Sequence, residues 1–139
     1  MKKLIAKLVL ILSIITLILS GCGSTSNIKT NKNSTKNSKL KVYKKNVEAS
    51  YYADKFNGKK TANGTVFNNN KLTAAHRTLP FGTKIKVTNL ANNQSVVVEI
   101  NDRGPQKKSR ELDLSKRAFM EITDNKNHGI LKIIIEIIN

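Results

Sequence analysis

Asp102 is a candidate for a side chain that transfers a proton in this 139-residue sequence. It follows the alternating segment 95–101 and precedes a Gly-Pro turn in the run Asn-Asp-Arg-Gly-Pro at 101–105. Neighbouring residues of a strand point to opposite faces, so Asp102 can face a groove while Asn101 and Arg103 point away. A carboxyl group that acts as an acid near neutral pH has to be partly buried. The alternative interpretation is an aspartate that caps the turn after the strand.

The histidines and the cysteine show no metal-ligand spacing. His76 follows the apolar segment 72–75, His128 lies in the polar loop 124–129, and the single cysteine is Cys22. A zinc site needs three or four such ligands brought together. We therefore expect no metal and no other cofactor. We interpret His128 as a solvated loop residue, and His76 as either a functional residue or a histidine that lines the barrel.

Short alternating segments must position these groups. Strand patterns cover 47–53, 83–89 and 95–101, and Asn-Gly dipeptides and a Pro-Phe-Gly turn interrupt them. Ser115 is a candidate N-cap for a short helix that ends near residue 121. The apolar segment 130–138 reads as a last strand covered on both faces. Many short strands with one short helix predict a mainly β chain that forms a small barrel.

The first twenty-two residues have the pattern of an export signal. Three lysines precede an apolar run of 12 residues from Leu8 to Leu19, which is shorter than the ~20 residues of a membrane-spanning helix. The run ends in Leu-Ser-Gly-Cys at 19–22, which resembles the lipobox of bacterial lipoproteins. We therefore predict a signal peptide over 1–22, lipidation of Cys22, and a lipid anchor at the extracytoplasmic face of the cell membrane.

The formal net charge of +16 is concentrated near the N-terminus. Residues 23–47 hold seven lysines and no acidic residue, and they are otherwise rich in Ser, Thr and Asn. Such a segment buries too little apolar surface to fold by itself. We predict a flexible basic linker over 23–47 and a folded domain over 48–139. A basic chain raises nucleic acid as a partner, but export argues against it and favours anionic lipids or wall polymers; the lysines could also serve only to keep the linker soluble.

Six linked runs resemble the rare lipoprotein A family. They are Ala-Ser-Tyr-Tyr at 49–52, Thr-Ala-Asn-Gly at 61–64, Thr-Ala-Ala-His-Arg-Thr-Leu-Pro-Phe-Gly-Thr at 73–83, Val-Thr-Asn-Leu at 87–90, Asn-Asp-Arg-Gly-Pro at 101–105 and Leu-Asp-Leu-Ser at 112–115. The resemblance covers residues 48–138 and implies a six-stranded double-psi β-barrel with one or two short helices.

The resemblance also implies an activity. Members of the family are lytic transglycosylases, which cut the bond between N-acetylmuramic acid and N-acetylglucosamine in peptidoglycan strands and leave a 1,6-anhydro end. Some members prefer strands without peptide stems. The sugar's own 6-hydroxyl replaces water, so one carboxyl group can serve first as acid and then as base. Asp102 matches the family's catalytic aspartate. His76 matches a family histidine, and we expect its side chain to hydrogen-bond Asp102 or the substrate.

Four further residues are candidates for substrate binding. Arg77 and Arg103 could contact acidic or N-acetyl groups, and Tyr52 could stack on a sugar ring. Thr65 stands where active family members carry glutamate, and it can hydrogen-bond a sugar but cannot titrate. This difference leaves open an alternative function as a non-catalytic or weakly active peptidoglycan-binding protein, similar to an expansin. We interpret Asp113 as structural, paired with Arg103 or with amides at the helix start, and expect a monomer.

Overall fold

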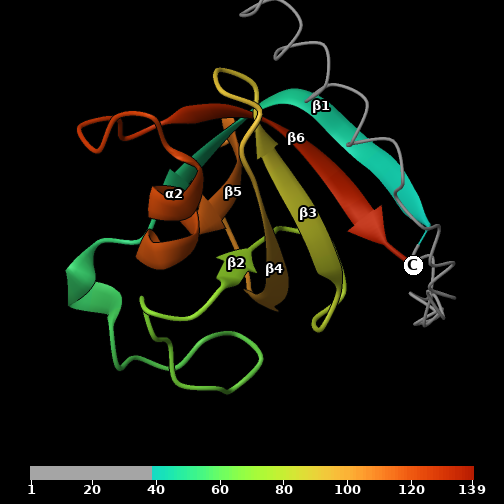
Figure 1. Ribbon diagram of the computed structural model, residues 1–139. Helices are drawn as coiled ribbons and strands as arrows, with labels where there is room; N and C mark the ends of the chain where they lie inside the picture. Colours follow the sequence, from blue (N-terminus) through green and yellow to red (C-terminus); the bar gives the residue numbers. More distant parts are fainter. Residues whose placement is uncertain (1–38) are drawn as a thin grey trace, which may run out of the picture. The chain divides into compact units, whose positions relative to one another are not determined.

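The computed structural model describes residues 39–139. The predicted signal peptide, Cys22 and the first part of the predicted linker lie outside the described residues. Six strands close into a barrel in the order β1-β5-β2-β4-β3-β6, as Figure 1 shows. The strands are β1 (Leu40–Tyr51), β2 (Thr73–Ala75), β3 (Lys84–Asn89), β4 (Ser95–Asp102), β5 (Arg110–Leu114) and β6 (Leu131–Ile138); the helices are the 3₁₀-helix η1 (Asp54–Phe56) and α2 (Lys116–Ile122).

The barrel begins earlier than the sequence predicted. Strand β1 starts at Leu40, so the expectation of a flexible linker up to residue 47 is wrong for residues 40–47. This half of β1 pairs antiparallel with β6, and Leu40 lies opposite Ile138. Its lysines face solvent, and Val42 is 46% exposed. The order comes from the backbone ladder along β6 together with the partly buried Tyr43 and Val47, which pack against the core. Two such positions are too few to give the alternating apolar pattern that sequence analysis detects.

The core is built from the inward faces of the strands and from one face of α2. Ile85 and Val87 of β3, Ile133 and Ile135 of β6, and Phe119 of α2 are fully buried. Alternation along β3 places Ile85 and Val87 inside and Lys84, Lys86 and Thr88 on the other face, as predicted. Strand β4 alternates in the same way up to Ile100, and the asparagines near the strand ends, Asn89 and Asn101, are buried. Burial of several branched side chains at roughly 1.5–3 kcal/mol each supplies most of the favourable free energy of folding.

Helix α2 begins as predicted, with Ser115 as its N-cap. The hydroxyl of Ser115 accepts a hydrogen bond from the backbone N–H of Ala118 and donates one to the carbonyl of Lys71. The cap therefore also ties the helix to the loop before β2. Neither helix in residues 39–139 has the length and hydropathy needed to cross a membrane.

The shortest strand, β2, sets the geometry of the candidate site. It lies between β4, to which it is parallel, and β5, to which it is antiparallel. Ala75 pairs with Asp102 on one side and with Asp113 on the other. Strands are spaced by about 4.8 Å, so the two acidic residues flank Ala75 at the same level of the sheet.

Candidate active site

A groove of about 630 Å³ opens beside Asp102. One wall is the segment that follows β1, which includes η1, and the other wall consists of the turn after β4 together with part of β5. Its lining includes two carboxylates, two aromatic side chains and several cations: Asp102, Asp113, Tyr52, Phe56, Lys55, Lys59, Lys60, Arg103 and Arg110. The described residues thus bring Asp102, Arg103 and Tyr52 together, as the sequence predicted.

The carboxyl group of Asp102 is held on three sides. Its Oδ1 accepts hydrogen bonds from the backbone N–H groups of Ala62 and Arg103, both at 2.8 Å. Its Oδ2 accepts one from the hydroxyl of Tyr52 at 2.6 Å. The side chain is half-buried and lines the groove. Asp102 therefore has features of both interpretations, because it braces the 61–65 turn and also faces a space where a saccharide can lie.

Tyr52 fixes Oδ2 of Asp102 from within an aromatic cluster. Its ring lies 4.4 Å from that of Phe67 and 5.7 Å from that of Phe56, measured between centroids. Burial, and then the hydrogen bond to Asp102, raise the pKa of Tyr52 far above its ordinary value. The hydroxyl therefore stays protonated and donates at any physiological pH. Because most of the ring packs inside the cluster, Tyr52 is a positioning residue more than the stacking platform that we expected.

Replacement of Tyr52 by Phe should leave the barrel folded and free Oδ2. Loss of one hydrogen bond to a charged group costs about 1.5–3 kcal/mol. If Asp102 acts in catalysis, we expect kcat to fall by roughly tenfold to a hundredfold with little change in KM, because the lost contact orients the reacting group. Steady-state kinetics on glycan strands measure this. A change confined to KM would contradict the positioning role and would favour direct contact with the sugar.

Asp113 is a second carboxylate of the groove, which the sequence did not reveal. Its Oδ1 accepts a hydrogen bond from Ser50 at 2.6 Å and lies 3.4 Å from Nε of Arg110. The expected partners, Arg103 or amides at the helix start, are wrong. Gly104 keeps the approach open: its φ of +148° suits glycine, and an added Cβ would lie 3.9 Å from Oδ2 of Asp113.

His76 does not orient the carboxyl group of Asp102. Its ring is 1% exposed. Nδ1 accepts hydrogen bonds from the backbone N–H groups of Thr78 and Leu79, so Nε2 carries the proton and donates it to Glu111 at 2.9 Å. Only the backbone N–H of His76 reaches Asp102, at its carbonyl oxygen. The expected side-chain contact is therefore wrong, and this histidine is a structural residue behind the site.

The side chain of Glu111 accepts hydrogen bonds from three other side chains, and the sequence analysis missed it. Besides His76, it accepts hydrogen bonds from Lys44 at 2.8 Å and from Arg77 at 3.1 Å. Burial lowers the pKa of His76 below its ordinary value. Burial acts in the opposite direction on Glu111, but the hydrogen bonds from Lys44 and His76 outweigh it and lower the pKa of this carboxyl. The pair is therefore a neutral imidazole bonded to a carboxylate.

The two arginines differ from expectation in what they contact. Arg77 donates to Glu111 and to the carbonyls of Pro105 and Arg110, and it does not line the groove. Arg103 lines the groove, but its guanidinium lies 3.7 Å from the ring centroid of Phe81. It also donates to the carbonyls of His76 and Leu79. Both arginines therefore stabilise the loops around the site, and Arg103 is the one that a substrate can reach.

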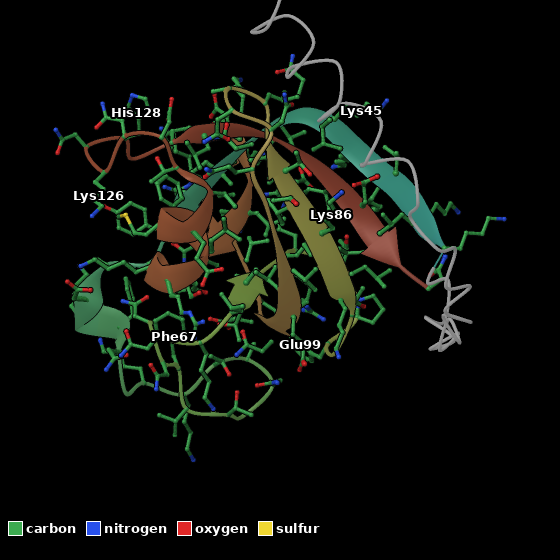
Figure 2. The ribbon with its side chains drawn as sticks, in the orientation of Figure 1. Lys45, Phe67, Lys86, Glu99, Lys126 and His128 are labelled. Atoms are coloured by element: carbon green, nitrogen blue, oxygen red, sulfur yellow. The ribbon has the colours of Figure 1, made fainter. Side chains whose placement is uncertain are left out.

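Thr65 lies on a neighbouring hollow and not in the groove of Asp102. Its hydroxyl and its N–H both donate to Oδ1 of Asn63, which braces the turn 61–65. The hollow also contains Glu99 on β4, and it has a volume of about 470 Å³. Figure 2 shows Glu99 at the end of the barrel that carries this loop. The turn itself links the two hollows, because Ala62 donates to Asp102.

Within residues 39–139, no group of three or more His, Cys, Asp or Glu side chains has the arrangement of a metal site. His128 lies in the exposed loop after α2, as the sequence suggested, with Nδ1 at 3.6 Å from Asp124. Figure 2 shows it on the side of the molecule away from Glu99.

Comparison with known proteins assigns the chain to a family. The sequence model of the family described as lytic transglycolase matches residues 44–135. The chain belongs to this family. It is 57% identical over 91 residues to the endolytic peptidoglycan transglycosylase RlpA of Rickettsia felis, which covers 63% of this chain and 40% of that protein. It is 53% identical over 87 residues to the probable endolytic peptidoglycan transglycosylase RlpA of Treponema pallidum, covering 63% of this chain and 27% of that protein. The predicted resemblance to the rare lipoprotein A family is confirmed, although the match spans less than half of these relatives.

Solved structures confirm the double-psi β-barrel. The Streptomyces papain inhibitor superposes with a TM-score of 0.54 at 21% identity and covers 71% of this chain and 97% of its own. The expansin of Clavibacter michiganensis superposes with a TM-score of 0.55 at 20% identity and covers 67% of this chain and 49% of its own. At such identities the likeness concerns the fold alone.

Proposed function

We propose that this lytic transglycolase family member is an endolytic peptidoglycan transglycosylase. It cleaves the bond between N-acetylmuramic acid and N-acetylglucosamine and forms a 1,6-anhydro end. The observation that carries the proposal is the groove in which Asp102 and Asp113 stand on either side of Ala75. The names of the relatives support a peptidoglycan transglycosylase, and the groove contains carboxylates of the kind that such a reaction needs.

Asp102 acts as the acid and then the base. Two backbone N–H groups hold Oδ1 and fix the plane of the carboxyl group, so Oδ2 beside Tyr52 is the oxygen that exchanges a proton. The protonated carboxyl gives its proton to the glycosidic oxygen as the bond to the anomeric carbon breaks. The 6-hydroxyl of the same sugar then attacks that carbon and returns its proton to the carboxylate. Asp113 provides a negative charge that stabilises the positive anomeric centre.

Product analysis tests the proposal. The purified full-length chain is incubated with peptide-free glycan strands and with intact wall sacculi, and mass spectrometry is used to search for anhydro-muramyl ends. We expect such ends from the wild type. Products with a reducing N-acetylmuramic acid would instead indicate hydrolysis, and the lack of any product would leave binding as the function.

The alternative is a wall-binding protein without catalysis, and Thr65 favours it. This residue offers a hydroxyl that is already bonded to Asn63, where a titratable group is expected in active relatives. Co-sedimentation with sacculi at modest salt separates the two functions. A chain that pellets fully but releases no soluble fragments fits the binding function, whereas release of fragments excludes it.

Replacement of Thr65 by Glu should raise the cleavage rate, by up to about tenfold, if the geometry around Asp102 is competent. The new carboxylate sits on the turn whose Ala62 contacts Asp102, and a placed acid or base contributes to proton transfer. The matched control is Thr65→Gln, which has the same size without the charge. Equal rates for the two variants would contradict a catalytic use of this position.

We also propose that the chain works at the extracytoplasmic face of the cell membrane, anchored through lipid on Cys22. The order of positive charge, apolar run, small residues and cysteine in the sequence supports this. Radiolabelled palmitate should enter the wild type but not Cys22→Ala, and the variant should leave the membrane fraction. Incorporation of radiolabelled palmitate into Cys22→Ala would contradict a lipid anchor on Cys22.

A further inference from the structure

The groove has more positive than negative charge. Asp102 and Asp113 supply two carboxylates, whereas five cationic side chains line the same space: Lys55, Lys59, Lys60, Arg103 and Arg110. If all are ionised, the groove carries a net charge of +3. A site for a neutral polysaccharide gains nothing from such an excess, because cations that lack partners repel one another in a concave site.

Two of the five cations already have a carboxylate or backbone-carbonyl partner. Arg110 lies 3.4 Å from Asp113. Arg103 stacks on Phe81 and donates to two backbone carbonyls. The remaining three, Lys55, Lys59 and Lys60, form no ion pair within residues 39–139. We name these three side chains the lysine rim.

Two lysines of the rim lie over an exposed aromatic ring. The ammonium groups of Lys55 and Lys59 lie 5.5 and 5.4 Å from the ring centroid of Phe56, which is 38% exposed. Lys60 is the next residue after Lys59, and it forms an isolated antiparallel β-bridge with Val66. Because both ammonium groups stand over the ring of Phe56, they are held at the edge of the groove, where an acidic group on a sugar can reach them. The arrangement therefore suits an acidic sugar better than a neutral one.

We propose that the lysine rim binds a carboxylate borne by the muramic acid residue of the glycan and thereby sets which sugars enter the groove. The inference rests on the proposed function, because it names the substrate feature that this site recognises. Every muramic acid carries a lactyl ether whose carboxyl group is free or joined to a peptide stem. In both cases a carboxylate is present, on the sugar itself or further along the stem. Lysine suits such a ligand because its ammonium is a flexible point charge with three donors.

Binding to matched oligosaccharides tests the inference without turnover. The full chain carrying Asp102→Asn is titrated calorimetrically with four glycans of equal length: one with free lactyl carboxylates, one with those groups converted to carboxamides, one with peptide stems, and a neutral chitooligosaccharide. We expect the free-lactyl glycan to bind about tenfold more tightly than the carboxamide and chitin forms at low salt. The difference should shrink as salt is added. Given that preference, weak binding of the stem-bearing glycan would assign the recognised carboxylate to the lactyl group alone, and equally tight binding would show that the lysine rim also accepts a carboxylate on the stem.

Charge variants connect the preference to these side chains. Lys55→Gln, Lys59→Gln and Lys60→Gln combined should remove the tenfold preference. The matched control combines Gln at Lys41, Lys45 and Lys84, which are exposed and do not line the groove. Figure 2 shows Lys45 on β1, on the far side of the barrel from Phe67, which lies in the segment between η1 and β2. Thermal unfolding should be unchanged in both triple variants, since none of the six side chains forms an ion pair within the described part of the chain.

Equal affinity for the free-lactyl and carboxamide glycans would overturn the inference. An equal loss of the tenfold preference in the two triple variants would also overturn it. Its failure is distinct from failure of the proposed function. A wild type that yields anhydro ends but shows no preference keeps the activity and loses the lysine rim as a specificity determinant. A chain that shows the preference but yields no product keeps the rim and loses catalysis. A chain that binds none of the four glycans overturns both.

Discussion

Replacement of Asp102 by Asn is expected to lower the rate of glycan cleavage by about 10²–10⁴-fold, the usual contribution of a positioned acid and base. The amide oxygen can still accept the hydrogen bonds from the backbone N–H groups of Ala62 and Arg103, and the amide NH₂ can donate to the hydroxyl oxygen of Tyr52, so the turn and the groove should persist. What it cannot do is donate a proton to the glycosidic oxygen and recover it from the 6-hydroxyl. Initial rates of anhydro-end formation measure the change.

The control for Asp102→Asn is Asp124→Asn, in the exposed loop where Asp124 lies near His128. That variant loses the same charge far from the groove and should keep wild-type activity. Circular dichroism should show that both variants are folded. A residual rate within threefold of the wild type for Asp102→Asn would contradict the proposed role, and Asp113 would then become the leading candidate for the acid.

The sequence predicted those parts of the fold that depend on local patterns. Alternation located β3 and β4, because one face of each strand is buried and the other is exposed. Ser115 was recognised as a cap because its hydroxyl serves a backbone N–H within the next turn. Asp102 was singled out because it matches the family's catalytic aspartate in the Asn-Asp-Arg-Gly-Pro run, and the local pattern placed it at the end of a strand beside a Gly-Pro turn.

Strands β2 and β5 were not predicted as strands. With three and five residues, they are too short for an alternating pattern to stand out. Their pairing partners are also distant in the sequence. For the same reason Asp113 was assigned to the wrong partners, since its hydrogen-bond donor, Ser50, lies 63 positions away.

His76 shows why residue type alone does not define a catalytic group. Its motif suggested a partner for Asp102, and its backbone indeed pairs with that residue. Which way the ring points depends on Glu111, 35 positions further along the chain and on another strand. A buried carboxylate that accepts from a lysine, an arginine and a histidine has no signature in a linear sequence. The alternative of a structural histidine, left open by the sequence, is the one that the described residues support.

Replacement of Glu111 by Gln is expected to lower the free energy of unfolding by about 2–3 kcal/mol. The side chain of Glu111 is only 10% exposed and accepts from His76, Lys44 and Arg77. A neutral amide presents one acceptor and two hydrogens to these donors. Breaking a fully buried pair costs about 3–5 kcal/mol, but Lys44 and Arg77 are 42% and 36% exposed, so water offsets part of the loss. Urea unfolding near pH 7 measures the difference.

Acidification should reduce the difference in the free energy of unfolding between the wild type and Glu111→Gln. The lowered pKa of Glu111 means that its stabilisation is complete above its ordinary value of 4.5 and is lost as pH falls through the lower value in the folded chain. His76 adds a second loss: its pKa lies below the ordinary 6.5, so the unfolded chain takes up a proton first and stability declines as pH falls below that value. The wild type should therefore lose stability from about pH 6.5 downward, and Glu111→Gln should approach it as pH falls below the ordinary glutamate value of 4.5. The control is Glu121→Gln, which breaks an exposed pair with Arg117 and should cost less than about 0.5 kcal/mol. A difference between the wild type and Glu111→Gln that stays constant from pH 7 to pH 3 would show that charge at position 111 does not hold this part of the barrel together.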